Sequence, residues 1–410
     1  MPKVNKKRKL SMKQREKMLL TPCKTREELQ KWIKYHLKMD IPSHTVSRHS
    51  NTNPLDAIWQ IYDVCVNDNN PENIEELLYV ASRGSGKTLG VAIAELLVML
   101  HDQRDVVHVG AILSQAKRCY DYQLSFMLND QMRPVIQQKE NPNGMILDKA
   151  NMEKSAFNLI DRYTKNKTKA TLEVLPCTLK AVNGPHVPLV VVDEIDTVQG
   201  DGLKAFKDIS GMLDSQGYRK ALRVGISTRK SRYGLMNKQI EDAHKANRTV
   251  KMWTALEFSK RCPDDRSGVN STAAYYNPDT LNVILPEEYD GLSPVQKSEY
   301  YYNEFYGEKC IQCPMAALCL SDAKNQQCES DMLKPITDPI KKTMENGPDW
   351  AISQLFNLKA SVEGIIYKEF EPRVHVKDWN SMWKKLTAVS YTHLRAHETR
   401  HDLVCRLLLE

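Results

Sequence analysis

The sequence of 410 residues has no apolar run long enough to cross a membrane. Its longest apolar stretch, residues 89–100, is interrupted by Glu95, whereas a spanning helix needs about 20 apolar residues. The basic start has no apolar segment behind it, so it does not have the pattern of a secretory signal. Internal repeats and low-complexity tracts are also lacking, which argues against a repeat architecture. We therefore expect no membrane partner.

Disulfide bonds are not expected, although the chain has ten cysteines. Four of them are scattered, as is typical of reduced, buried thiols in a cytosolic protein: Cys23, Cys65, Cys119 and Cys177. The formal charge of +7 is modest but unevenly distributed, since residues 3–17 carry eight Lys and Arg against one Glu. Such an arm is suited to a phosphate backbone, and a solvated tail is the alternative.

The stretch LLYVASRGSGKTLGVAIAELLVML, residues 77–100, indicates a phosphate-binding loop. A strand over 77–80, a glycine-containing loop and a helix over 89–100 form the context in which backbone N–H groups bind phosphate. Lys87 is expected to reach the β- and γ-phosphates of a nucleotide, and Thr88 to hold Mg²⁺ through its hydroxyl. Ala81 replaces the first glycine of the usual pattern. The predicted nucleotide contacts in this loop are Ser82, Arg83, Gly84, Ser85, Gly86, Lys87 and Thr88.

Two acidic residues follow a second buried strand in VPLVVVDEIDTV, residues 187–198. Asp193 is placed to orient the water shell of Mg²⁺, and Glu194 to take a proton from an attacking water. Arg83, inside the loop, is expected to neutralise charge that grows on the γ-phosphate. The predicted catalytic residues are therefore Glu194 and Arg83.

Further elements of an α/β domain surround these motifs. Residues 106–111 predict a strand, and residues 112–165 are expected to be mainly helical. A third strand over 222–226 ends at Ser227 and Thr228, a hydroxyl pair placed to sense ATP against ADP and to couple hydrolysis to movement.

A tryptophan and a glutamine upstream of the loop are candidates for adenine recognition. Trp59 offers a stacking surface, and Gln60 offers an amide for hydrogen bonds. The alternative is a helix that covers the sheet without touching a nucleotide.

Four cysteines cluster in EKCIQCPMAALCLSDAKNQQCES. The spacing C-x2-C-x5-C-x8-C is suited to one tetrahedral metal, with zinc or an iron–sulfur cluster as the occupant and free thiols as the alternative. The predicted ligands are Cys310, Cys313, Cys319 and Cys328, with Cys262 as a rival for the fourth position. The metal would clamp a loop-rich linker that has little core of its own.

Together these motifs resemble the large terminase subunit of tailed double-stranded DNA phages. The resemblance covers roughly residues 50–385 and rests on six stretches, ASRGSGKT, VNGPHVP, DEID, GISTRKSRYG, the CxxC linker and GIIYKEFEPRVHV. It implies a P-loop (RecA/ASCE-like) ATPase sheet flanked by helices, a cysteine-containing linker and the start of an RNase H-like nuclease domain. The expected division is a basic arm and helix over 1–50, the ATPase over 51–258, the linker over 259–350 and the nuclease start over 351–388.

The resemblance also implies a function. ATP hydrolysis, with Mg²⁺, would drive viral double-stranded DNA into a procapsid in the host cytoplasm. A ring of these subunits would dock on the portal protein and work with a small terminase subunit. The implied roles are phosphate contacts for Arg83 and Lys87, Mg²⁺ ligation for Thr88 and Asp193, the catalytic base for Glu194, and coupling for Ser227 and Thr228.

The end of the sequence, residues 389–410, matches translated sequencing adapter. VSYTHLRAHE, residues 389–398, is the translation of a transposase adapter, and DLVCRLLLE, residues 402–410, that of a flow-cell primer. The first metal-binding aspartate that the resemblance leads us to expect near Val389 does not occur there. We therefore expect a truncated protein that binds ATP and does not cut DNA, whereas the full-length protein would also be a metal-dependent endonuclease.

Two other classes of function stay open. A helicase-like, nucleic-acid-remodelling ATPase would need a second RecA-like domain, and residues 260–388 lack the strand–helix alternation of such a domain. A non-enzymatic, zinc-stapled interaction protein would keep only a vestigial nucleotide site and would have no need of Glu194 as a base.

Overall fold

The computed structural model describes residues 11–70, 74–133, 136–137, 145–151, 154–160, 167–213, 221–230 and 234–359. They belong to one compact unit that ends at residue 360, and residues 361–410 form a second unit that lies outside this description. The predictions of translated adapter over 389–410 and of the nuclease start from residue 361 onwards fall in that second unit. Within the described ranges, no helix has both the length and the apolar character needed to span a bilayer.

The centre of the first unit is a sheet in which six neighbouring strands run parallel, in the order β6-β2-β7-β8-β1-β9. Their register pairs Gly110 with Asp193, Asp193 with Ile226, and Val80 with Ser227. The carboxyl ends of these strands therefore meet at one edge, as the motifs require. The strands are β1 (Glu76–Ala81), β2 (Val106–Gly110), β6 (Lys167–Pro176), β7 (Leu189–Asp193), β8 (Leu222–Ser227) and β9 (Val250–Trp253).

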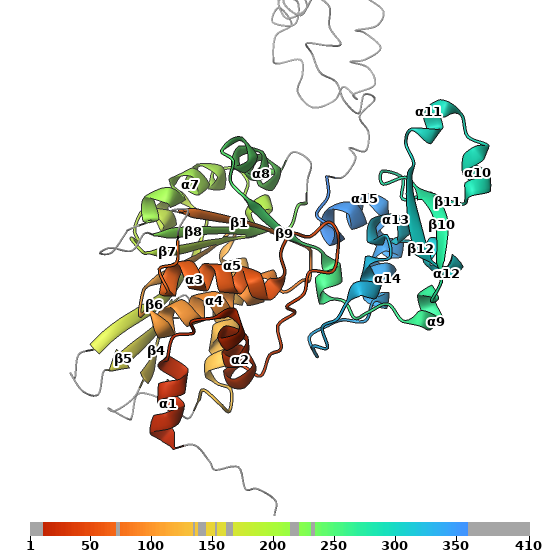
Figure 1. The fold of residues 1–410 in the computed structure, drawn as a ribbon. Helices are drawn as coiled ribbons and strands as arrows, with labels where there is room; N and C mark the ends of the chain where they lie inside the picture. Colours follow the sequence, from red (N-terminus) through yellow and green to blue (C-terminus); the bar gives the residue numbers. More distant parts are fainter. Residues whose placement is uncertain are drawn as a thin grey trace, which may run out of the picture. The chain divides into compact units, whose positions relative to one another are not determined.

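Helices cover both faces of this sheet, as Figure 1 shows, so its strands are apolar on both sides. In β1, Leu77 and Tyr79 pack on the first face and Leu78 and Val80 on the second. The first face carries α1 (Met12–Leu20), α2 (Arg26–His36), α3 (Pro54–Val66), α4 (Lys87–His101) and α5 (Leu113–Met127). The second carries α6 (Leu179–Val182), α7 (Gly202–Asp208) and α8 (Leu235–Lys245). The predicted P-loop ATPase fold class is thus confirmed.

The edge strand β9 is closed by the chain segment before α3. The backbone N–H of Asn51 donates to the carbonyl of Met252 at 3.0 Å, and the N–H of Met252 donates to the Asn51 side chain at 2.7 Å. The Asn51 amide also donates to the carbonyl of Val250 at 2.8 Å. These contacts occupy outward-facing backbone groups of β9 that an edge strand would otherwise leave unpaired.

The expectation of mainly helical structure over residues 112–165 is wrong beyond α5. Three further strands extend the sheet next to β6, and the pairs β4–β5 and β5–β6 are antiparallel. Backbone pairing to the edge of the sheet thus prevails over the weak helical pattern of this stretch. The strands are β3 (Ile136–Gln137), β4 (Met145–Asn151) and β5 (Lys154–Ile160).

The region predicted to be a loop-rich linker with little core has a sheet and two apolar clusters of its own. Its sheet is antiparallel, in the order β11-β10-β12, and one cluster packs Ala274 and Phe305 against Ala316 and Leu320. The strands are β10 (Ser271–Tyr276), β11 (Val283–Ile284) and β12 (Tyr301–Tyr306). The helices are α9 (Asp264–Ser267), α10 (Pro286–Asp290), α11 (Pro294–Lys297), α12 (Glu308–Ile311), α13 (Ala316–Cys319), α14 (Thr337–Asn346) and α15 (Pro348–Trp350).

A π-helical turn, Ala351–Leu355, follows α15 and completes the second apolar cluster. Ile352, Leu355 and Phe356 are buried there against Met315 and Leu318. A domain boundary at residue 351, as expected from the sequence, would cut through this cluster, and the compact unit runs on to residue 360. Residues 351, 352, 355 and 356 are thus packed within the first unit, and the division of the chain into domains stays a prediction.

Candidate nucleotide-hydrolysis site

The loop between β1 and α4 has the backbone of a phosphate-binding loop. Gly84 and Gly86 have φ values of 76° and 72°, in the left-handed region that glycine adopts without strain. A Cβ atom at Gly86 would lie 2.5 Å from the ring of Phe258, so space also requires glycine there. Gly86 is the N-cap of α4, and the first N–H groups of a helix have no partner within it. The loop thus presents backbone donors at the carboxyl edge of the sheet.

The predicted Mg²⁺ ligands lie side by side. The Thr88 hydroxyl, in the first turn of α4, donates to Oδ2 of Asp193 at 2.6 Å. Asp193 ends β7 and is 3% exposed. Strand β8 lies between β1 and β7, and this spacing brings the end of β7 within reach of α4. Two hard oxygen donors in contact form a suitable corner for Mg²⁺.

Glu194 is held between two lysines. Its Oε1 lies 2.9 Å from Nζ of Lys87, and its Oε2 lies 2.6 Å from Nζ of Lys230. Glu194 has a left-handed φ of 56°, which turns the chain sharply at the end of β7. Burial opposes ionisation of Glu194, yet the two ammonium groups prevail and lower its pKa to about 2. Glu194 is therefore a carboxylate at neutral pH.

Two buried hydroxyls beside the loop lack a partner. Oγ of Ser82 and Oγ1 of Thr228 are fully enclosed, and neither has a hydrogen-bond partner in the described part of the chain. Buried polar groups are nearly always paired, so an orphan at a site needs a reason. A phosphate group offers several acceptor oxygens of the kind that these two hydroxyls lack.

The predicted coupling residue Ser227 is tied to the acidic strand end. Its Oγ accepts from the backbone N–H of Asp196 at 3.1 Å and donates to the Thr228 carbonyl at 3.2 Å. The Asp196 carboxylate accepts from the N–H groups of Lys230 at 2.7 Å and Met236 at 3.0 Å. Neither Asp196 nor Lys230 was among the residues predicted for the site, although Asp196 belongs to the DEID motif.

The structure leaves two of the predicted roles as predictions. Arg83 is exposed within the loop, and its backbone N–H donates to the carbonyl of Gln354 at 2.7 Å, so its contact with the γ-phosphate stays a prediction. Gln60 accepts from the Tyr79 hydroxyl at 2.9 Å and lines a cavity at the amino ends of β1, β8 and β9, opposite the loop. Its role in adenine recognition stays a prediction.

Residues 351–357, which we call the strap, contact the loop from the linker. The Asn357 side chain donates to the carbonyl of Trp253 at 2.7 Å, and the same carbonyl accepts from the N–H of Ser82 at 3.3 Å. Arg229 donates to the Asn357 carbonyl at 3.3 Å. Outside the strap, Nζ of Lys334 donates to the carbonyl of Gly84 at 2.9 Å. No sequence motif signals these contacts.

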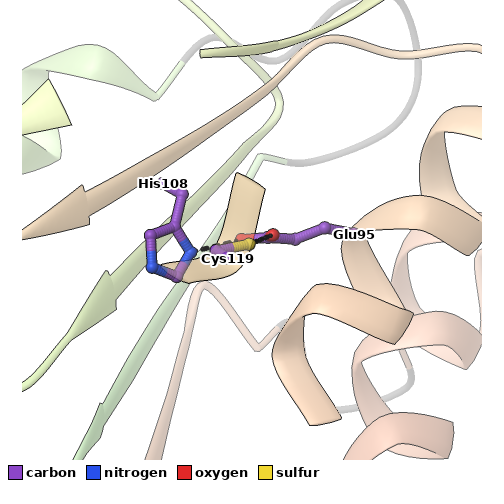
Figure 2. Close-up of side chains that lie close together, drawn as sticks. All are labelled: Glu95, His108 and Cys119. Atoms are coloured by element: carbon purple, nitrogen blue, oxygen red, sulfur yellow. Dashed lines mark hydrogen bonds and ion pairs between the residues drawn. The ribbon is translucent and has the colours of Figure 1, made fainter. Parts of the chain in front are cut away.

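Three polar side chains meet in the core of the sheet domain, as Figure 2 shows. Nδ1 of His108 lies 2.8 Å from Oε1 of Glu95, and the Cys119 thiol donates to Oε2 at 2.6 Å. Gln123 also donates to Oε2, at 3.3 Å. Burial would lower the pKa of His108, but the Glu95 carboxylate raises it. Glu95 thus interacts with three side chains, and it ties α4 to β2 and α5.

Among the predicted metal ligands, the structure separates Cys328 from the others. Cys310, Cys313 and Cys319 line one small cavity, and Cys262 lines it with them. Cys328 is not among its lining residues, and its backbone N–H donates to the Gln326 side chain at 2.9 Å. Cys262, rather than Cys328, therefore lies with Cys310, Cys313 and Cys319.

No protein family and no curated protein matches this sequence. Among solved structures, the large terminase of bacteriophage HK97 is 17% identical with a TM-score of 0.35, covering 51% of this chain and 42% of that one. The large terminase ATPase domain of Thermus phage P74-26 is 12% identical with a TM-score of 0.32, covering 43% of this chain and 70% of that one. The UvsW helicase of bacteriophage T4 is 13% identical with a TM-score of 0.27, covering 51% of this chain and 62% of that one. The chain thus spans less than half of the HK97 terminase, and likeness at this level carries no argument about function.

Proposed function

We propose that this chain is an ATP-hydrolysing subunit of a DNA-translocating motor. The observation that carries the hydrolysis is the cluster at the carboxyl edge of the sheet. A glycine loop, a lysine, a hydroxyl–carboxylate pair and a second carboxylate converge there from β1, α4 and β7. This combination is suited to phosphoryl transfer to water.

The residues present fit a nucleotide with Mg²⁺. Thr88 and Asp193 would hold the ion, and the buried hydroxyls of Ser82 and Thr228 lack the acceptors that phosphate oxygens would supply. Bound Mg²⁺ supplies charge neutralisation on the β- and γ-phosphates. The backbone N–H groups of the loop and the start of α4 orient the same phosphates.

Lys87 gives the site a way to activate its base. Its ammonium now pairs with Glu194, and phosphate is a competing anion of higher charge. When Lys87 turns to phosphate, Lys230 is the one cationic partner that Glu194 keeps among the described residues, so its pKa rises and its carboxylate becomes a better proton acceptor. Glu194 would then take the proton of the attacking water.

The first experiment compares Glu194→Gln and Lys87→Ala with the unchanged chain. We expect Glu194→Gln to lower ATP turnover at least about 100-fold and to retain ATP binding, since proton transfer commonly contributes 10²–10⁴-fold. Lys87→Ala should weaken binding itself. Turnover would be followed as phosphate release and binding with a fluorescent ATP analogue. Full turnover by Glu194→Gln would refute the assigned base.

For the motor we infer double-stranded DNA as the track. The motif combination supports a terminase, and the residues described beyond β9 form an antiparallel sheet rather than a second parallel domain of helicase type. The subunits would form a ring on a portal protein, with a small terminase subunit, in the host cytoplasm. In the full-length protein, a nuclease would follow the linker.

The track can be tested separately from hydrolysis. We expect double-stranded DNA of any sequence to stimulate ATP turnover, because backbone phosphates carry no sequence information. A helicase would instead separate the strands of a labelled duplex. Strand separation coupled to ATP turnover would favour the helicase alternative and leave the hydrolysis site intact.

A further inference from the structure

The linker contains a cavity of about 30 Å³ whose wall includes four cysteines from three stretches of chain. Cys262 precedes α9, Cys310 lies in α12, Cys313 follows α12, and Cys319 ends α13. Cys319 is buried and the other three are half-buried. Three of the four thiols, those of Cys262, Cys310 and Cys313, each contribute to the pKa of at least one other. A cavity of this size holds an ion and no organic ligand.

Tight turns bring these thiols to one place. Gly307, with φ of 79°, starts the turn into α12, and the N–H of Cys313 donates to the carbonyl of Cys310 at 3.1 Å. Leu320 and Ser321 have left-handed φ values of 47° and 69°, which reverse the chain after Cys319. Non-glycine residues are uncommon in this region, and two in succession mark a turn that its surroundings must hold in place.

The fourth cysteine is fixed by backbone contact to that turn. The N–H of Cys262 donates to the carbonyl of Ala323 at 3.1 Å, which brings the chain leaving the ATPase against the chain leaving Cys319. Cys328 is instead close enough to Lys34 to raise the pKa of that lysine, behind the larger effect of Asp40. Its thiol therefore belongs to a different neighbourhood.

The charge around the cavity is positive. Arg266, Lys309 and Lys324 line it together with the cysteines. Nζ of Lys324 is nearly enclosed, binding the Asp264 carboxylate and, at 3.0 Å, the carbonyl of Gly268. Four thiolates around a divalent ion carry a net charge of −2, so nearby cations lower the cost of burying such a centre.

Hydrogen-bond donors also face the sulfurs. The Ser321 hydroxyl lies 3.4 Å from Sγ of Cys310. Burial raises the pKa of Cys313, and the backbone N–H of Met315 and the Arg266 side chain partly oppose this effect. Donors of this kind stabilise a thiolate more than a thiol.

We propose that Cys262, Cys310, Cys313 and Cys319 together bind one zinc ion, and that Cys328 takes no part. Binding releases the thiol protons and forms four Zn–S bonds, with no redox step. In the described ranges, the one group of three or more ligand residues whose ligand atoms all lie within 4.8 Å of one another is Glu95, His108 and Cys119, so the four linker sulfurs are spaced more widely than this. Tetrahedral bonds of about 2.3 Å place sulfurs about 3.8 Å apart. Binding of the ion therefore requires the thiols to move closer together.

The proposal does not depend on ATP hydrolysis, and its test does not use activity. The 410-residue chain would be purified without added metal and its zinc measured by mass spectrometry, for the unchanged chain and for Cys262→Ser and Cys328→Ser. We expect one zinc per chain in the unchanged protein and in Cys328→Ser, and less than half of that in Cys262→Ser. Loss of zinc in Cys328→Ser with retention in Cys262→Ser would overturn the ligand set.

Two further measurements cover a serine variant that fails to fold. Cys262→His keeps a zinc ligand and should retain the ion, and Co²⁺ added to the chelator-treated, unchanged chain should give the strong visible absorption of tetrahedral cobalt with thiolate charge transfer. An unchanged chain that holds no stoichiometric metal, or that holds iron with inorganic sulfide, would refute the zinc site.

Discussion

At the scale of single residues, Glu194 must be stabilised as a buried carboxylate and must also be basic enough to accept a proton. The carboxylate is 14% exposed, so water stabilises its charge only weakly, and Lys87 and Lys230 stabilise it instead. A general base should not be bound too firmly, since a strongly lowered pKa makes a poor proton acceptor. In the proposed mechanism Lys87 leaves the Glu194 carboxylate for phosphate, and the pKa of Glu194 then rises towards that of a useful base.

The same ion pairs make the free energy of unfolding decrease at low pH. The folded-state pKa of Glu194 is lowered to about 2 from 4.5, so its stabilising contribution is complete above the unfolded value and is lost as pH falls towards 2. We expect Glu194 to contribute on the order of 3 kcal/mol to the free energy of unfolding at pH 6, and progressively less below pH 4.5. Urea titrations at pH 6, 4 and 3 would measure this loss.

Glu194→Gln is the matched control for that pH dependence. It has no carboxylate to protonate, so its free energy of unfolding should fall less between pH 6 and 3 than that of the unchanged chain. Equal losses in both proteins would assign the acid sensitivity to other carboxylates.

At the scale of elements, the strap connects the linker to the nucleotide loop. Asn357 has a left-handed φ of 56°, and its side chain shares the Trp253 carbonyl with the N–H of Ser82. We expect Asn357→Ala to lower the free energy of unfolding by about 2 kcal/mol, from a lost hydrogen bond and a strained backbone. The KM for ATP should rise as the loop loses support, and steady-state kinetics would show it.

Asn357→Gly separates these two effects. Glycine tolerates the left-handed conformation, so this variant loses the hydrogen bond alone and should cost about 1 kcal/mol. If both variants keep the KM of the unchanged chain, the strap supports folding and does not act on the nucleotide site.

The buried Glu95 connects helix α4 to β2 and α5 through hydrogen bonds. We expect Glu95→Leu to lower the free energy of unfolding by about 3–5 kcal/mol, because His108, Cys119 and Gln123 would lose their shared acceptor. Cys119→Ser keeps a donor and should cost much less. Urea denaturation of both variants would check the difference, and a Glu95→Leu protein as stable as the unchanged chain would show that the network contributes nothing net.

At the scale of the whole molecule, local patterns predicted the sheet domain better than the linker. Asp193 ends β7 and Glu194 follows it, whereas Lys87 and Thr88 start α4 after the short loop that follows β1, so strand order and one loop bring these residues together. The contact of Lys334 with Gly84 spans 250 positions, and no local pattern encodes it. The antiparallel strands after α5 were missed because pairing with β6, rather than their own periodicity, determines their structure.

The choice among cysteines shows the same limit. Spacing identified Cys310, Cys313 and Cys319 correctly as neighbours, because short turns connect them. It could not choose between Cys262 and Cys328, because that choice depends on how the chain leaving the ATPase folds back on Ala323.

The covered edge of β9 bears on how copies of this chain can assemble. Proteins that join through bare strands build continuous sheets between subunits and are prone to aggregate without limit. Here Asn51 already takes the place of the next strand, through bonds to Met252 and Val250. In the proposed ring, a neighbour that reached this edge would contact it through side chains, because Asn51 already occupies backbone groups of β9 that could pair with another strand.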